Sequence, residues 1–486
     1  MKVSAQKTCE EVKSKLHNSS DIKTRSLKVF NKEVCLVYIA DITDSQLLND
    51  TVINPLTNIN KKAKGKIIDF VKDEVLSSIE ITDISTIEDA VQELLQGKTL
   101  ILLEGTDKIL GCDMEKVVVR AVEQPPTSLV IRGPREGFNE SIKYNLALIR
   151  QRAKSDDLVI TDLELGNITK TKVSVVYFDS LADKGVVKEI LKRLKKIKID
   201  GVMDSHYLIS YLSNRPHSLF KQVGDTEKPD ILVAKMLEGR VGILVDGSPI
   251  ALTLPFILIE DLQNSDDYYG QPVHVTFVRM LRLIGVIMAV LLPGAYIALN
   301  KFHYKILPLE FLVTIMNSSA GIPFSPFVEI IFCVLLFEIL YEANLRMPQY
   351  LGIATSIVGA LILGETAVNA GLVSPPAVMI VALSGITFYI VPSMAGQFSI
   401  LRLVGCIIGA CLGIYGMLLF CVYLVAYLAD FDSYKSPHLA PAAPFITDDQ
   451  KDFVLRKPIS DMKKRPKSIP NNKKNDDRRQ DNDNED

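Results

Sequence analysis

A glutamate and an asparagine stand in one of the apolar tracts of this chain. The stretch GETAVNAGLVSPP, residues 364–376, contains Glu365 and Asn369 four residues apart. Residues at that spacing lie on one face of a helix. A charged side chain within hydrocarbon costs roughly 3 kcal/mol or more. Glu365 therefore requires water, a polar partner or a functional role.

Three interpretations of this pair are open. In the first, Glu365 lies near a membrane interface or is satisfied inside a helix bundle by a hydroxyl or amide group. In the second, Ile362, Glu365 and Asn369 line a water-filled path. In a symmetric oligomer, Glu365 then forms an acidic ring that favours cations and Ile362 forms a hydrophobic gate. In the third, Glu365 is the protonation site of a proton-coupled carrier.

The remaining sequence offers no pattern typical of catalysis or metal binding. We find no Ser/His/Asp order, no Cys/His nucleophile arrangement and no paired carboxylates with the signature of a cleft. The seven cysteines are scattered without a CxxC pair, and the six histidines are dispersed. We therefore expect reduced thiols, no enzymatic activity, no cofactor and no metal site. The 55 basic residues balance 57 acidic ones, which argues against a global role in nucleic-acid binding.

Composition divides the chain into parts that must position these residues. Residues 1–276 are charged and mixed, residues 277–428 are mostly apolar, and residues 429–486 are polar. We predict an α/β N-terminal half on the cytoplasmic side, an α-helical multi-span membrane domain, and a largely disordered C-terminal tail. The first residues contain no apolar core, so we expect no secretory signal.

Short apolar runs alternate with amphipathic segments in the N-terminal half. Strands are predicted at 34–40, 99–105, 116–122, 128–133, 158–165 and 172–178, and helices at 85–97, 139–152 and 185–200. Such alternation is typical of α/β architecture. We expect a flexible lead-in over 1–27, a first subdomain over 28–160 and a second over 161–276.

Three segments of this half could carry more than structure. The loop RGPREGF, 132–138, has a phosphate-loop position but lacks the lysine and the Ser/Thr of a P-loop, so we interpret it as a structural turn. Asp246-Gly247-Ser248 lies between two apolar runs and predicts a hairpin. The helix 185–200 has an apolar face and a lysine-rich face. That basic face is either solvent-exposed surface or a contact with a membrane or partner.

The apolar region predicts several membrane helices. Long spans are expected at 283–299, 326–345, 350–373 and 402–428, with a shorter one at 377–391 and an interfacial or re-entrant segment at 306–318. The number of crossings stays open. Arg279 and Arg282 precede the first span, which places the N-terminal half on the cytoplasmic side. Gly405, Gly409 and Gly413 recur every four residues, so we expect that face to pack closely against another helix.

Two long motifs resemble a known family. They are RGPREGFNESIKYNLALIRQR, 132–152, and EGRVGILVDGSPIALTLPFILIEDLQ, 238–263. The chain resembles the A-subunit of bacterial spore germinant receptors, the GerA family, over roughly residues 30–440. The most specific part of the first motif is Arg132, Gly133, Pro134, Arg135, Glu136, Gly137 and Phe138. A close relative, the SpoVA-associated A-subunit homologue of spore-formers, shares this architecture.

The resemblance implies a place and a set of partners. These are the inner membrane of the spore, a transporter-like B-subunit that senses the nutrient, and a lipoprotein C-subunit. It further implies a homo-oligomeric ring of A-subunits in the lipid bilayer, which forms a nutrient-gated channel for monovalent cations. No family motif fixes the pore residues, so the stripe with Glu365 is our own inference. A carrier, a nutrient-binding receptor module and a non-conducting scaffold remain alternatives.

Overall fold

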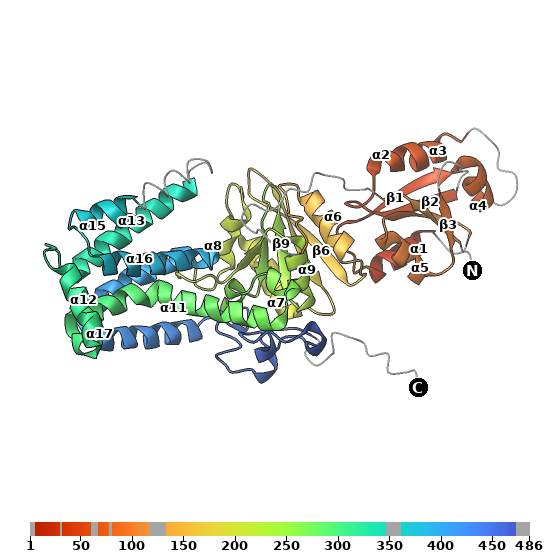
Figure 1. Ribbon diagram of the computed structural model, residues 1–486. Helices are drawn as coiled ribbons and strands as arrows, with labels where there is room; N and C mark the ends of the chain where they lie inside the picture. Colours follow the sequence, from red (N-terminus) through yellow and green to blue (C-terminus); the bar gives the residue numbers. More distant parts are fainter. Residues whose placement is uncertain are drawn as a thin grey trace.

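Three folded parts follow one another along the chain. The computed structural model describes residues 5–29, 32–59, 67–76, 80–106, 108–115, 133–346 and 361–472. Figure 1 shows a first α/β subdomain, a second α/β subdomain beside it, and a helical domain at the opposite end from the first. The two predicted α/β subdomains are confirmed by two separate five-stranded sheets.

The first subdomain is a sheet covered by helices on both faces. Its strand order is β1-β2-β4-β5-β3, and all its described pairs are antiparallel. The strands are β1 (Ile22–Val29), β2 (Lys32–Ile39), β3 (Ile81–Ile84), β4 (Lys98–Leu103) and β5 (Ile109–Asp113). One face packs against α1 (Ala5–Lys15) and α5 (Ile87–Leu95). The other packs against α2 (Ser45–Leu48), α3 (Asn54–Thr57) and α4 (Ile67–Phe70).

The prediction of a flexible lead-in over 1–27 is wrong from residue 5 onward. Helix α1 buries Ala5, Cys9 and Val12 against the first sheet. These small apolar residues recur at three- and four-residue spacing, but they are few, and the rest of the helix is polar. The sheet supplies the burial that holds such a short helix, because helices of this length are marginal by themselves.

The second subdomain repeats the arrangement. Its strand order is β6-β7-β9-β10-β8, again with antiparallel pairs throughout the described part. The strands are β6 (Leu158–Leu165), β7 (Thr171–Phe178), β8 (Gly224–Thr226), β9 (Val241–Val245) and β10 (Ala251–Leu254). Side chains of β7 alternate between the two faces of the sheet. Val173 and Val175 pack in the core with α7 (Lys184–Lys196) and α8 (Ile209–Leu212). Val176 and Phe178 pack in the core with α6 (Ile142–Arg152) and α9 (Pro229–Leu237).

The boundary between the subdomains differs from the predicted one at residue 160. Helix α6 packs in the core of the second sheet, so the second subdomain already includes residues 138–152. The predicted strand 116–122 and nearly all of 128–133 lie outside the described residues. The hairpin at Asp246-Gly247-Ser248 is confirmed: it joins β9 to β10, and Gly247 has φ 88°.

A buried ion pair joins the two subdomains. Arg150 of α6 donates through Nε to Asp21 Oδ2 at 2.8 Å, and both side chains are 1% exposed. Ser19 completes the contact, since its hydroxyl donates to Asp21 at 2.6 Å and accepts from the backbone N–H of Ile160 at 2.9 Å. Removing one partner of such a pair leaves an uncompensated buried charge, which costs about 3–5 kcal/mol.

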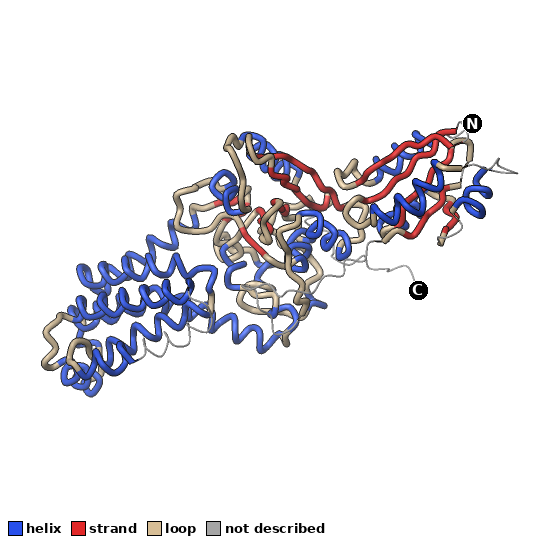
Figure 2. Tube along the Cα trace, turned by 90° about the horizontal axis from the view of Figure 1, so that it is seen from above, coloured by secondary structure: helices blue, strands red, loops and turns tan. Residues whose placement is uncertain are grey.

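The helical domain is built on two long helices. They are α11 (Pro272–Phe302) and α17 (Ala395–Ala429). The other α-helices among the described residues of this domain are α12 (Leu309–Ser319), α13 (Pro326–Arg346), α15 (Ala367–Asn369) and α16 (Pro375–Ile386). Figure 2 shows this part as helices without strands. In the part of the chain that the structure describes, two helices are long and apolar enough to cross a membrane, at Pro272–Phe302 and Pro392–Ala429. They contain the predicted spans 283–299 and 402–428.

The other predicted spans do not form helices that are long and apolar enough to cross a membrane in the described part of the chain. Residues 326–345 form helix α13, which contains three glutamates and does not meet that criterion of length and composition. Residues 377–391 form α16 and a short 3-10 continuation, and 306–318 fall mainly in α12. Residues 350–360 of the span predicted at 350–373 lie outside the described residues.

The prediction of a largely disordered tail over 429–486 is wrong for residues 430–472. This C-terminal segment lies against the second subdomain (Figure 1). Its isolated apolar residues Phe431, Tyr434 and Ile469 are all buried. Backbone bonds fix it as well, since Leu258 donates its N–H to the carbonyl of His438 at 2.9 Å. Residues 473–486 lie outside the described residues.

We expect His438 to make this segment sensitive to acid. Its ring is fully buried between Phe256 and Phe431, and burial lowers the pKa of His438 to about 4. The folded chain therefore holds the neutral ring, while the unfolded chain protonates near pH 6.5. Stability is fully present above that pH and is lost as the pH falls toward 4. The loss is on the order of 2–3 kcal/mol.

Thermal unfolding of the purified full-length chain at pH 7 and pH 4.5 measures this effect. His438→Phe should reduce the difference in melting temperature between the two pH values. His217→Phe is the matched control, because His217 is exposed. An equal pH response in wild type and His438→Phe would contradict the assignment.

Candidate functional site in the helical domain

The predicted polar stripe lies on the surface of the helical domain. Glu365 belongs to a π-helical turn, Leu361–Thr366, and Asn369 ends α15. Both side chains are exposed, whereas Ala367 between them is buried. The side chain of Ile362 lies outside what the structure describes. In a single chain, then, Glu365 and Asn369 face outward rather than into the helix bundle.

Glycines allow α11 and α17 to touch along their backbones. A Cβ atom added at Gly409 would lie 2.3 Å from the carbonyl oxygen of Gly294, and one added at Gly294 would lie 2.6 Å from the carbonyl oxygen of Gly405. No side chain fits at these positions without a shift. Gly413 has another role, because its φ of 62° breaks the helical geometry of α17 beside Phe302.

A buried ion pair connects three helices of this domain. Arg402 of α17 is 0% exposed in its side chain, and its NH2 group lies 2.5 Å from Glu338 Oε1 of α13. Ser399 donates to the same carboxylate at 2.8 Å, and Arg402 also donates to the hydroxyl of Ser384 on α16 at 3.3 Å. The guanidinium lies 4.5 Å from the ring centroid of Phe388, within the range of a cation–π contact.

A second carboxylate is buried nearby. Glu329 of α13 is 2% exposed and accepts a hydrogen bond from the backbone N–H of Ser374. Ser374 in turn caps the start of α16, where its hydroxyl accepts from the N–H of Ala377 at 3.4 Å. The break at Ser374-Pro375-Pro376 is thus held by a hydrogen bond to a side chain of the neighbouring helix.

Sequence reasoning did not single out Arg402 and Glu338 as a pair. Their positions are 64 residues apart, and only the packing of α13 against α17 brings them together. One signal was present: Arg402 opens a long apolar tract, and Glu338 stands within another. Charges in such tracts commonly pair with each other inside a bundle.

The loop Gly133–Phe138 makes structural contacts. Phe138 is buried in the core of the second subdomain, and its N–H donates to the carbonyl of Glu227 at 2.7 Å. Glu136 pairs with Arg152 at 2.6 Å. A Cβ atom at Gly133, whose φ is 110°, would lie 2.5 Å from the ring of Tyr269. Arg132 lies outside the described residues. The loop therefore abuts α10 (Asp266–Tyr269), the last turn before α11.

A cluster of charges joins α11 to the rest of the molecule. We call Asp267, Arg279, Arg282, Asp452 and Arg456 the junction cluster. Asp267 is 3% exposed and accepts from Arg279 at 3.0 Å and from Arg282 at 2.7 Å. Arg279 also pairs with Asp452 at 2.9 Å, and Arg456 donates to the backbone carbonyl of Asp267 at 3.3 Å. The two arginines that precede the first predicted span are thus ion-paired to the chain itself.

The second subdomain reaches this junction through another buried carboxylate. Glu260 is 6% exposed and pairs with Lys235 at 2.7 Å and Arg240 at 3.1 Å. Burial opposes ionisation of this group, but Arg240 and Lys235 outweigh it and hold the pKa of Glu260 below its usual value. The carboxylate fixes a short 3-10 helix, Leu258–Leu262, a few residues before Asp267.

Comparison with known proteins identifies the family. A family model described as Bacillus/Clostridium GerA spore germination protein matches residues 10–468. The chain belongs to the GerA family of spore germination proteins. The predicted resemblance is therefore confirmed, and the match extends beyond the expected range in both directions.

GerA relatives match this chain nearly end to end. Spore germination protein KA of Bacillus subtilis (strain 168) is 32% identical over 468 residues, covering 95% of this chain and 86% of that protein. Spore germination protein B1 of the same strain is 33% identical over 437 residues, covering 90% of each chain. A crystal structure of the N-terminal domain of the A subunit of the Bacillus megaterium spore germinant receptor GerK3 matches with 28% identity and a TM-score of 0.41. It covers 52% of this chain and 96% of that one.

The backbone contact between α11 and α17 generates a direct test in this GerA protein. Gly409→Ala places a methyl group against Gly294, and such overpacking costs about 1–3 kcal/mol. Gly396→Ala, also in α17, meets no atom within 4 Å, so it should be neutral or stabilise by about 0.5–1 kcal/mol. Thermal unfolding of the purified chain in detergent compares the two. Equal melting temperatures would show that the two helices do not touch as described.

Proposed function

We propose that this chain is the A-subunit of a spore germinant receptor, and that several copies assemble their helical domains into a nutrient-gated cation channel. Its partners are a transporter-like B-subunit and a lipoprotein C-subunit in the inner membrane of the spore, with the α/β half on the core side. Membership of the GerA family and the names of its spore germination relatives support the receptor role. The role involves no catalysis by this chain.

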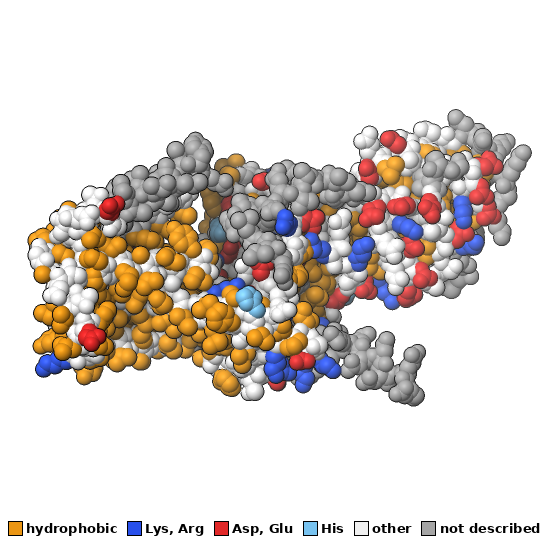
Figure 3. Space-filling model, viewed as in Figure 1, with side chains coloured by type: hydrophobic (Ala, Val, Ile, Leu, Met, Phe, Trp, Pro, Cys, Tyr) orange, Lys and Arg blue, Asp and Glu red, His pale blue; other side chains and the backbone are white. Residues whose placement is uncertain are grey.

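The exposed apolar surface of the helical domain carries the proposal. In the most apolar 18-residue stretch of each helix, only 28% of the residues of α11 and 44% of those of α17 are buried. Figure 3 shows hydrophobic side chains spread across the face of this domain in view, in contrast to the charged first subdomain. Exposed residues of the two helices include Val273, Ile284, Ile287, Leu412, Tyr415, Leu419 and Val422. Such a surface needs lipid or further protein to cover it.

The exposed position of Glu365 on the helical domain is consistent with a channel. It is exposed on this apolar domain, and a carboxylate facing lipid is costly. A ring of copies removes the cost if Glu365 and Asn369 face a common water-filled path. There the carboxylates attract monovalent cations. Arg402 and Glu338, in contrast, pair with each other inside one subunit. Their role in the proposal is to hold the helices together rather than to contact permeating ions.

Germinant-triggered cation flux tests the proposal. The full complex of this chain with its B and C partners is placed in liposomes, and flux is measured with and without germinant. Glu365→Gln should lower the triggered flux roughly tenfold, because a cleft lined by charge raises the local ion concentration by about that factor or more. Glu310→Gln, at an exposed position in the first turn of α12, is the matched control and should leave flux unchanged.

Other outcomes separate the alternatives. An assembled complex that passes no cations with germinant would contradict the channel and leave a scaffold or a nutrient-binding module. Flux that saturates with cation concentration and changes steeply with pH would favour a carrier with Glu365 as protonation site. Triggered flux that is equal in wild type and Glu365→Gln would move the pore lining to another helix. Flux without any response to germinant would favour the SpoVA-associated homologue.

A further inference from the structure

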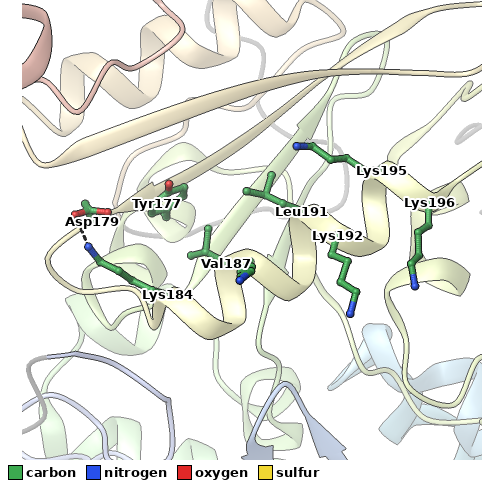
Figure 4. A pocket seen from close by; sticks show the side chains of 9 residues that line it. Tyr177, Asp179, Lys184, Val187, Leu191, Lys192, Lys195 and Lys196 are labelled. Carbon is green, nitrogen blue, oxygen red and sulfur yellow. Dashed lines mark hydrogen bonds and ion pairs between the residues drawn. The ribbon is translucent and has the colours of Figure 1, made fainter.

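A basic groove runs along α7 in the second subdomain. It encloses about 590 Å³ and is lined by Tyr177, Asp179, Lys184, Val187, Lys188, Leu191, Lys192, Lys195 and Lys196. Figure 4 shows Val187 and Leu191 pointing toward the strand that carries Tyr177, with lysines along the helix on either side. The lining combines an apolar floor with five lysines and a single aspartate.

Most of this positive charge is not neutralised within the described residues. Lys184 pairs with Asp179 at 3.2 Å, and Lys192 lies 3.9 Å from Glu189. Lys188, Lys195 and Lys196 make no ion pair with any part of the chain that the structure describes. All three are exposed. The groove therefore suits an acidic segment.

The described chain ends in contact with the residues that precede α7. Asn472, its last residue, donates through its backbone N–H to the carbonyl of Leu181 at 2.9 Å and through its side-chain amide to the carbonyl of Ala182 at 2.6 Å. Asn471 forms a β-bridge with Ala182. Ala182 is two residues before Lys184, the first lysine of the lining. The bonds at Asn471 and Asn472 anchor the chain at this point.

The sequence beyond this anchor is acidic at its end. Residues 481–486 read DNDNED and carry four carboxylate side chains without a basic residue. Eight residues lie between Asn472 and Asp481, and the nine steps of an extended chain from one to the other reach about 30 Å. The groove lysines run from Lys184 to Lys196, and the twelve helical rises between these two residues span about 18 Å along α7. The acidic end can therefore reach every lysine of the groove.

We propose that residues 481–486 of the same chain occupy the basic groove of α7. Their carboxylates would pair with Lys188, Lys192, Lys195 and Lys196, and the contact would continue the packing of the C-terminal segment onto the second subdomain. This contact is independent of whether the helices conduct ions.

Carbodiimide coupling of the purified full-length chain in neutral detergent tests the proposal. The reagent joins a carboxylate to an amine that is in contact with it, and mass spectrometry then identifies the joined residues. The expected products link Asp481, Asp483, Glu485 or Asp486 to the groove lysines. Lys170 and Lys198 are exposed and outside the lining, so they serve as internal controls. The yield should fall in 1 M salt, where the Debye length is about 3 Å.

Charge reversal sharpens the test. The triple variant Lys192→Glu, Lys195→Glu and Lys196→Glu should lower coupling to α7 about tenfold, the loss expected from three exposed ion pairs worth a few-fold each. Adding Asp481→Lys, Asp483→Lys and Glu485→Lys should restore coupling, now with the charges exchanged. Rescue in this six-residue variant also shows that the reversed groove is still folded.

Three results would overturn the proposal. Coupling spread equally over the groove lysines, Lys170 and Lys198 would show that the tail has no preferred site. Absence of coupling at low salt would show an empty groove. The groove would belong to an anionic membrane surface instead if two results came together. Neutral detergent would give no product that joins the tail to the groove lysines, and vesicles of phosphatidylglycerol would protect these lysines from chemical modification.

Discussion

The buried carboxylate of Asp267 is the interaction on which the placement of α11 against the second subdomain and the C-terminal segment depends. It accepts from Arg279 and Arg282 of α11, and its backbone carbonyl accepts from Arg456 of the C-terminal segment. Loss of the carboxylate would leave Arg282 without its carboxylate partner and Arg279 with Asp452 alone. Breaking such a buried network costs several kcal/mol, so the start of α11 is held firmly against the soluble half.

Contacts continue without a gap from this carboxylate into the helical domain. At Gly294, the backbone of α11 contacts α17 at Gly405 and Gly409. On α17, Arg402 pairs with Glu338 of α13 and donates a hydrogen bond to Ser384 of α16. On the soluble side, Glu260 ties α9 and β9 to the segment just before Asp267. These contacts join the second subdomain to α16, which packs beside the turn that carries Glu365.

Local patterns in the sequence predicted the elements better than their assembly. The apolar run 34–40 and the amphipathic run 85–97 become β2 and α5, because period-2 and period-3.6 patterns depend on neighbouring residues. Helix α1 and the C-terminal segment were missed because their few apolar residues are buried only by distant strands. The boundary at 160 was wrong for the same reason, since α6 belongs to a core that forms far along the chain. Arg402 and Glu338 carry no mutual spacing signal at all, whereas the glycines of α17 had one.

The central claim is that Asp267 couples the soluble half to the helices. Under the proposed channel function, germinant-triggered cation release from the reconstituted complex would measure this coupling most directly. Asp267→Asn should lower the triggered release by about tenfold while assembly is unchanged, within the 5- to 150-fold range typical of coupling between sites. Asp430→Asn removes only an exposed pair with Arg215 and should release cations as wild type does. Wild-type release from a fully assembled Asp267→Asn complex would contradict the account.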